Sequence, residues 1–209
     1  MKNNNHVMVD IETLDNVSFS AITKIAAVRF NIKTGEVLDK FEVTVDLQSC
    51  IDLNMSINAD TLLWWLETNA DLLRDILNDQ KKVKLGEALH MFRMWLDSNK
   101  PSNLYIWGNS NRFDLGILHN AYTKCDQGNK LPWLFRNERD VRTLIDLPNI
   151  LNGLLTDKDV TTLNPNIKQA VIELNSGQKH NPIDDCLVQI SYVVATMNNL
   201  STFINKDSI

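Results

Sequence analysis

Cysteine, glycine, proline and long apolar runs are all scarce in this chain. The three cysteines, Cys50, Cys125 and Cys186, lie far apart and form no Cys-x-x-Cys pair, so we expect neither a disulfide framework nor a zinc site. No stretch approaches the run of about 18 apolar residues that spans a membrane, and the polar segment from Met1 to His6 lacks the apolar core of a signal peptide. We therefore expect a cytoplasmic protein with no membrane partner.

An excess of positive charge is missing as well. The chain has 21 lysines and arginines against 26 aspartates and glutamates, a formal net charge of -5. There is no global basic field of the kind that attracts nucleic acid or an anionic membrane. This balance does not exclude an enzyme that clusters carboxylates around divalent cations, because those cations then carry the positive charge that meets a phosphate.

The rest of the composition is typical of a globular domain. The chain has 209 residues, of which 44% are hydrophobic, and this is enough to bury a core without disulfides or a structural metal. Neither a repeat nor a linker rich in Pro, Gly or Ser divides it. We predict a single domain over residues 1–209, with a core over about residues 7–198 and short polar tails.

Apolar periodicity predicts an α/β fold with a mixed sheet. Short β-branched or alternating runs predict strands at residues 7–9, 25–30, 37–45 and 104–107. Apolar spacing of three and four residues predicts helices at residues 58–77, 84–97, 113–122, 167–174 and 182–197. The segment at 58–77 forms one helix, or two with a break near Asn69, and Asn58 or Asp60 caps its start. A short strand-like run accompanies the basic segment at residues 136–142. A hairpin followed by helices and a later buried strand is typical of an α/β domain.

Two carboxylates close the first predicted strand. Asp10 and Glu12 stand two residues apart in the segment VMVDIET at residues 7–13, and residues at this spacing on a strand point to the same face. Adjacent carboxylates in a sheet repel each other and lose hydration unless a cation lies between them. The pair therefore indicates a divalent-cation site, although the pattern alone also suits a solvated strand edge.

Two more acidic positions and a histidine follow along the chain. Asp114 comes after the strand at residues 104–107 and begins a predicted helix, where the helix dipole also favours an ordinary acid. Asp185 lies in the first turns of the last predicted helix, and His180 precedes it by five residues in a loop. Taken singly, His180 also suits a surface or capping position.

In this order, the strand-borne Asp-x-Glu, the later Asp and the His-x4-Asp resemble the motifs of the DEDDh branch of the 3′–5′ exonucleases. Within that branch, the segments WW at 64–65, YIWGNSNRFD at 105–114, PW at 132–133 and RDVRT at 139–143 are similar to a phage and bacterial group. This group includes the T4-type DexA exonuclease, the nuclease domain of exonuclease VIII and the mycobacterial RNase AS (Rv2179c-like). The resemblance runs from about Val7 to Val194.

The chain departs from this group at two places. Ser110 and Asn111 stand where the group often has Gly-Ala, and Leu115 stands where a polar residue is common. These differences concern substrate contacts more than chemistry, because the four acids and the histidine are all present. The resemblance implies a ribonuclease-H-like mixed sheet of about five strands flanked by helices.

The resemblance also implies a two-metal mechanism. Asp10, Glu12, Asp114 and Asp185 would hold two divalent cations, Mg²⁺ or Mn²⁺, since oxygen-only ligands suit these hard ions. His180 would accept the proton of the attacking water. The residues expected to contact the substrate are Thr13, Trp64, Trp65, Asn109, Asn111, Phe113, Arg139 and Arg142.

Several of the residues expected to contact the substrate also suit a purely structural role. Trp64 and Trp65 are adjacent, so on a helix one of them packs in the core while the other faces the cleft, and Trp65 fits the apolar period better. Arg139 and Arg142 suit either a phosphate contact or structural pairing with Asp140 or Asp146.

We expect hydrolysis of the phosphodiester bond at the 3′ end of single-stranded nucleic acid, with release of nucleoside 5′-monophosphates and DNA slightly favoured over RNA. The alternatives are a 3′–5′ exoribonuclease of the RNase AS type, a hydrolase of small phosphate esters or short oligonucleotides, and a catalytically silent nucleic-acid-binding module. The intact set of acids counts against the last of these. The partners are DNA or RNA 3′ ends, and the oligomeric state stays open, a homodimer included.

Overall fold

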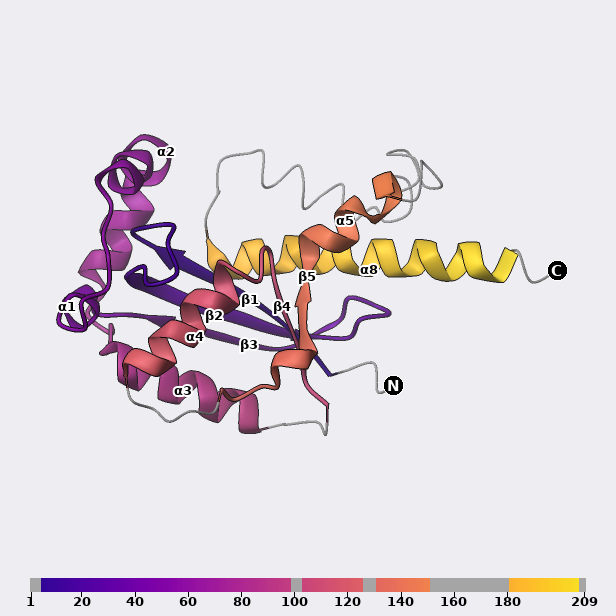
Figure 1. Cartoon of the computed structure of the whole chain (residues 1–209), viewed down its shortest axis with the longest axis horizontal. Helices are drawn as coiled ribbons and strands as arrows, with labels where there is room; N and C mark the ends of the chain where they lie inside the picture. The colour runs from indigo at the N-terminus through magenta and orange to yellow at the C-terminus, as the bar shows by residue number, and fades with distance from the viewer. Residues whose placement is uncertain (1–4, 99–102, 126–130, 151–180, 207–209) are drawn as a thin grey trace.

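The computed structural model describes residues 5–98, 103–125, 131–150 and 181–206, which fold as a five-stranded sheet between helices (Figure 1). The strands are β1 (His6–Thr13), β2 (Ile22–Phe30), β3 (Val37–Thr44), β4 (Tyr105–Gly108) and β5 (Glu138–Asp140), in the spatial order β3-β2-β1-β4-β5. β1 pairs antiparallel with β2, and β2 pairs antiparallel with β3, whereas β4 lies parallel to both β1 and β5. The mixed sheet predicted from the sequence is confirmed, and β1 extends beyond its prediction to Thr13.

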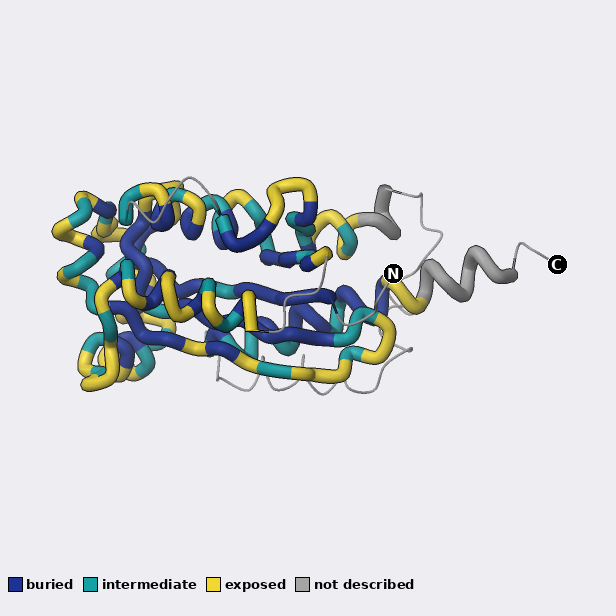
Figure 2. The backbone as a smooth tube through the Cα atoms, turned by 90° about the horizontal axis from the view of Figure 1, so that it is seen from below, coloured by how far each residue is buried: buried dark blue, intermediate teal, exposed yellow. Residues whose placement is uncertain are grey.

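The two faces of the sheet are covered by different helices. Val7, Val9 and Ile11 of β1 belong to the core beneath α3 (Leu85–Ser98) and α4 (Asp114–Lys124). Met8 belongs to the core beneath α8 (Pro182–Lys206). The central strands are buried along most of their length (Figure 2). Because side chains alternate along a strand, Asp10 and Glu12 share the face of Met8, toward α8.

Helix α2 (Ala59–Asn78) follows the short helix α1 (Leu47–Ile51). The Asn58 side chain caps α2 by accepting hydrogen bonds from the backbone N–H groups of Asp60 and Thr61, and Asn69 has non-helical torsions that kink the helix. The Asn58 cap is one of the two that the sequence predicts, and the kink at Asn69 decides between the one helix and the two helices that it left open. Trp65 packs with Leu14 in a small third core, and this contact ties α2 to the chain just after β1.

The segment around Arg139 differs from its prediction. The strand-like run expected at 136–142 resolves into the short 3-10 helix η1 (Phe135–Asn137), strand β5 and helix α5 (Val141–Ile150). The helix begins where it does because Asp140 Oδ1 accepts hydrogen bonds from the backbone N–H groups of Arg142 (2.9 Å) and Thr143 (3.4 Å). An aspartate before Val141 is thus a helix start that apolar spacing alone did not reveal.

Helix α8 begins as expected at residue 182 and runs beyond the predicted end near Met197. The predicted helix at residues 167–174 lies outside the described residues. Among the helices that the structure describes, none is long and apolar enough to cross a membrane.

Candidate active site

The end of β1 carries the first two acids into the space beneath α8. Asp10 and Glu12 lie opposite Ala26 and Lys24 of β2, so both carboxylates rise from the interior of the sheet. Glu12 is only 8% exposed. Thr23 Oγ1 donates a hydrogen bond to the Glu12 carbonyl at 3.1 Å, which holds this part of the strand in place.

The start of α8 supplies a third acid. The Asn181 side chain accepts a hydrogen bond from the Ile183 N–H at 3.1 Å, and its carbonyl accepts one from the Asp185 N–H at 2.9 Å. Pro182 occupies the first helical position, where its missing N–H has no cost. This short Asn-Pro signal starts the helix so that Asp185 falls in its first turn, above the end of β1.

The loop after β4 supplies the fourth acid. Asp114 is the first residue of α4 and is 3% exposed. A side chain at Gly108 would come within 3.0 Å of Asp114 Oδ2, so the absence of a side chain there gives Asp114 room. Ser110 has a φ of 116°, in a region that glycine adopts far more easily.

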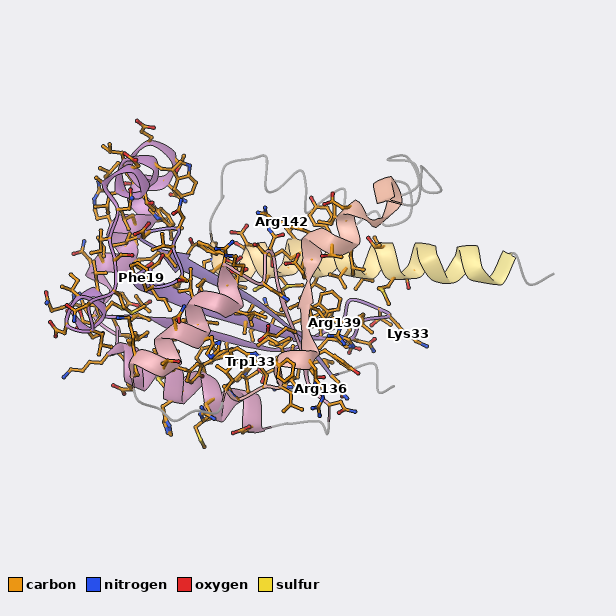
Figure 3. The ribbon with its side chains drawn as sticks, in the orientation of Figure 1. Phe19, Lys33, Trp133, Arg136, Arg139 and Arg142 are labelled. Atoms are coloured by element: carbon orange, nitrogen blue, oxygen red, sulfur yellow. The ribbon has the colours of Figure 1, made fainter. Side chains whose placement is uncertain are left out.

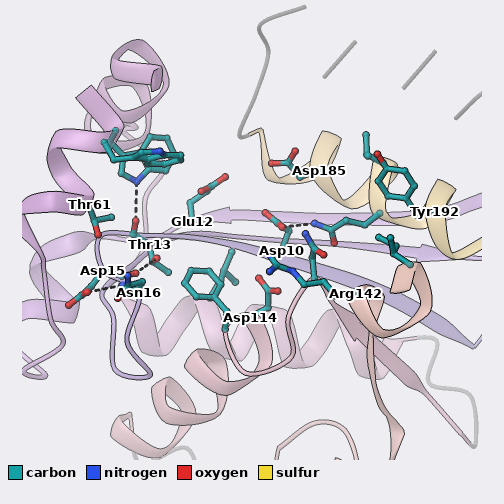
Figure 4. Close-up of a pocket in the computed structure, with 18 of the residues that line it drawn as sticks. Asp10, Glu12, Thr13, Asp15, Asn16, Thr61, Asp114, Arg142, Asp185 and Tyr192 are labelled. Carbon is teal, nitrogen blue, oxygen red and sulfur yellow. Dashed lines mark hydrogen bonds between the residues drawn. The ribbon is translucent and has the colours of Figure 1, made fainter. Parts of the chain in front are cut away.

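These acids meet in one pocket (Figure 4). One carboxylate oxygen from each of Asp10, Glu12 and Asp185 lies within 4.8 Å of the others. Asp114 points into the same pocket from the side of α4, across from Asp185 (Figure 4). The end of β1, the start of α8 and the start of α4 thus bring together the four acids that the sequence singled out.

Burial and mutual repulsion change the acidity of this cluster. Burial, with the charges of Asp114, Glu12 and Asp185, raises the pKa of Asp10 well above its ordinary value. Burial and the same kind of repulsion raise the pKa of Glu12 to about 9. Burial also raises the pKa of Asp114 to about 7 and that of Asp185 to about 6. Each shift means that a proton, or another cation, is favoured over a bare carboxylate.

The donor set fits divalent cations. It offers only carboxylate oxygens, which are preferred ligands of Mg²⁺ and Mn²⁺. These carboxylates lie close together despite their mutual repulsion. Lys24, which lies near Glu12, pairs with Glu42 of the neighbouring strand at 2.7 Å. The residues that would hold such ions are Asp10, Glu12, Asp114 and Asp185.

Most of the predicted substrate residues line the same pocket, which has a volume of about 730 Å³. Trp65 is buried and donates its indole N–H to the Thr13 carbonyl at 3.0 Å. Trp64 is 42% exposed and meets the Trp65 ring edge to face, with centroids 5.4 Å apart. The structure thus places Trp65 in the core and leaves Trp64 at the pocket wall. The predicted residues along the pocket are Thr13, Trp64, Trp65, Asn109, Phe113 and Arg142.

Two predicted residues are not among those that line the pocket. The Arg139 guanidinium lies over the Tyr105 ring, 4.7 Å from its centroid, and donates to the carbonyls of Arg136 and Glu138. These contacts are structural, and they differ from the pairing with an acid that the sequence offered as the alternative to a phosphate contact. Arg139 is on β5, whereas Arg142 is on α5 (Figure 3). Asn111 is held by its backbone N–H, which donates to Asp140 Oδ2 at 2.8 Å. His180 lies outside the described residues.

The pocket also contains residues that the sequence did not single out. Gln189 and Tyr192 come from α8, and Thr61 and Asp60 come from the first turn of α2. Gln189 follows Asp185 by four residues, a spacing that places both on one face of a helix. In the sequence this spacing does not by itself distinguish Gln189 from the other polar residues of the helix.

Comparison with models of known protein families shows which family the chain belongs to. A family model described as the 3′–5′ exoribonuclease Rv2179c-like domain matches residues 5–197. The chain belongs to this Rv2179c-like family. A comparison with curated proteins finds no match.

Solved structures with the same fold are distant in sequence. The nuclease domain of 3′hExo, described as a DEDDh family member bound to rAMP, is 13% identical with a TM-score of 0.55, covering 93% of this chain and 91% of that one. An E. coli ExoI–ssDNA complex is 12% identical with a TM-score of 0.63, covering 96% of this chain and 41% of that one. A product-bound exonuclease I is 14% identical with a TM-score of 0.61, covering 96% and 46%. The Rv2179c-like chain therefore spans less than half of these exonuclease I chains.

Two expectations from the sequence are confirmed by these findings. The resemblance to DEDDh exonucleases agrees with the family match, and the ribonuclease-H-like fold agrees with the structural neighbours. The Rv2179c-like chain is thus an enzyme, a 3′–5′ exonuclease whose acidic cluster fits a metal-dependent site.

Proposed function

We propose that this chain removes nucleoside 5′-monophosphates one at a time from the 3′ end of single-stranded RNA, with Mg²⁺ or Mn²⁺ as its cofactor. The observation that carries the proposal is the convergence of four buried or partly buried acids in one open pocket beside an exposed tryptophan. A purely structural acidic cluster would gain nothing from such burial, because each uncompensated charge is costly.

Asp10, Glu12, Asp114 and Asp185 hold the cations in this proposal. Two divalent ions, when bound, lower the pKa of a water and neutralise charge on the phosphate that is attacked. His180 accepts the proton of the attacking water, because histidine is the side chain that most often serves as a general base near neutral pH. This role for His180 comes from the DEDDh motif that the sequence carries.

Residues at the two ends of the pocket position the nucleotide strand. The exposed ring of Trp64 stacks on the terminal base, a contact worth about 1–3 kcal/mol per base in single-strand binding. Thr13 and Asn109 offer polar contacts near the acids. Arg142, at the first turn of α5, faces a phosphate on the opposite side of the pocket.

The choice of RNA rests on the description of the family, which names an exoribonuclease. The slight preference for DNA that the sequence predicts is tested against this choice in the experiment below. Discrimination needs only one or two contacts to a 2′-hydroxyl.

A matched pair of single-stranded RNA and DNA oligonucleotides of one sequence tests this proposal. Each is incubated with Mn²⁺ or Mg²⁺ and then with a chelator, and the products are identified by chromatography. We expect nucleoside 5′-monophosphates from RNA, released faster than from DNA, and no release with the chelator. Faster release from DNA would overturn the choice of RNA. Cleavage of small phosphate esters without any polymer cleavage, or no cleavage at all, would overturn the exonuclease and leave the hydrolase or the binding module.

A further inference from the structure

Gln189 reaches across from α8 to the first acid of the pocket. Its side chain is buried, and its Nε2 donates a hydrogen bond to Asp10 Oδ1 at 2.9 Å (Figure 4). It lies one helical turn beyond Asp185, on the same face of α8. One helix therefore carries both a carboxylate of the cluster and the group that holds another carboxylate in place.

The chemistry of an amide suits this position. A lysine or arginine here would neutralise Asp10 and compete with a cation for it, and another carboxylate would add repulsion. An apolar side chain would leave the Asp10 carboxylate free to rotate. A neutral N–H donor fixes the orientation of Asp10 Oδ1 and leaves the negative charge of the cluster intact.

The other end of the same amide is unsatisfied. Gln189 Oε1 is buried and has no hydrogen-bond partner among the described protein atoms. Buried acceptors without a donor are rare and destabilising. Because Gln189 lines the acidic pocket, a water in the hydration shell of a bound cation is a donor that fits this oxygen in size and polarity.

We propose that Gln189 is a positioning residue of the metal centre, whose N–H orients Asp10 for cation binding and whose Oε1 accepts a hydrogen bond from water bound to the cation. The proposal rests on the proposed function, since it needs the acidic cluster to hold metal. It adds a residue outside the DEDDh motif to the machinery of the site.

The test is a titration of the full chain with Mn²⁺ alone, followed by calorimetry, without nucleic acid. In Gln189→Met, which keeps the length but removes both polar atoms, we expect the dissociation constant for Mn²⁺ to rise about 10- to 100-fold, as for loss of other groups that orient metal ligands. Gln189→Asn, which keeps the amide but shortens its reach, should also weaken binding. Ser191→Ala is the matched control on α8, because the Ser191 hydroxyl donates to the Leu187 carbonyl of its own helix. We expect its Mn²⁺ affinity to stay within about twofold of wild type.

Two outcomes would overturn the proposal. One is a Mn²⁺ affinity within about twofold of wild type in both folded Gln189 variants, which would leave Gln189 a packing residue. The other is unchanged Mn²⁺ affinity together with a raised KM for the oligonucleotide, which would make Gln189 a substrate contact. Melting curves of the metal-free variants show whether each one folds. Metal binding is measured without substrate, so an absence of nuclease activity in wild type would count against the proposed function and not against this role.

Discussion

The carboxylates of Asp10, Glu12, Asp114 and Asp185 are each unfavourable as bare charges in the acidic pocket, and this favours a bound cation. Glu12 and Asp114 are nearly buried, and their raised pKa values follow from burial and from the charges of their neighbours. A buried charge is tolerated when it is paired or coordinates a metal. The four acids of the motif are therefore unfavourable as charged groups unless a ligand compensates them.

His180→Ala tests the chemistry at this scale. We expect the turnover number to fall about 10²- to 10⁴-fold, because a positioned general base typically contributes this much. Binding of Mn²⁺ should stay close to that of wild type, since the cations are held by carboxylates. Single-turnover kinetics measure the fall in rate, and a Mn²⁺ titration measures the metal affinity. An unchanged turnover number would remove His180 from the role of base.

The four acids could be predicted from the sequence because each stands at the end of an element that apolar spacing also predicts. Asp10 and Glu12 show a strand period, and Asp185 follows a helix start. Gln189 could not be found by the same logic, because its role depends on a contact across 179 positions of sequence to Asp10. The positive φ of Ser110 was equally hidden, because glycine is the residue that usually indicates such a conformation.

At the scale of elements, Asp140 joins the start of helix α5 to the β4–α4 loop, and both carry residues that line the pocket. Its Oδ1 caps α5 at Arg142, and its Oδ2 accepts from the Asn111 N–H of the β4–α4 loop. The helix that carries Arg142 and the loop that leads to Asp114 are thus anchored to one side chain. β5 and α5 could not be separated in the sequence, because the strand has only three residues and the deciding signal is a single cap.

Asp140→Ala should loosen both elements. We expect the free energy of unfolding to fall by about 1–2 kcal/mol, the usual cost of losing a helix cap. Chemical denaturation measures the change. Asp146→Ala on the exposed side of the same helix is the control, and we expect a change within about 0.5 kcal/mol. Equal effects of the two substitutions would show that Asp140 does not hold these elements together.

At the scale of the whole molecule, the acidic cluster makes stability depend on pH. The folded pKa values of Glu12 and Asp114, about 9 and 7, lie above the ordinary range of unfolded carboxyl groups. Between the pKa of the unfolded carboxyl group and the raised pKa of the folded one, the folded chain binds a proton that the unfolded chain has released. The free energy of unfolding therefore falls as pH rises through this range. His6 shifts the other way, since burial and Arg139 lower its pKa to about 4, and it therefore acts only below neutral pH.

We expect the metal-free protein to melt at a lower temperature at about pH 8 than at about pH 6.5, because Glu12 and Asp114 lower the free energy of unfolding over this window and His6 contributes little to it. Mn²⁺ should raise the melting temperature more at the higher pH, because the carboxylates then lose fewer protons on binding. Differential scanning calorimetry measures both trends. Glu12→Gln should flatten the pH dependence, and a metal-free protein that becomes more stable over this window would contradict the account.

The net negative charge of the chain is compatible with a nucleic-acid substrate if the acidic pocket binds cations. Two bound divalent cations would move the formal charge from -5 to about -1 and concentrate positive charge where a phosphate arrives. Away from the pocket the chain has no basic excess, so we expect few phosphate contacts and a shallow dependence of binding on salt.

The central claim, a metal-dependent exonuclease that works from the 3′ end, is tested most directly by a time course on single-stranded RNA labelled at its 5′ end. With Mn²⁺ the wild-type chain should produce a ladder that shortens one nucleotide at a time and keeps the label. Asp10→Ala or Asp185→Ala should leave the RNA intact. Early release of the labelled nucleotide, internal fragments without a ladder, or full activity in either variant would contradict the account.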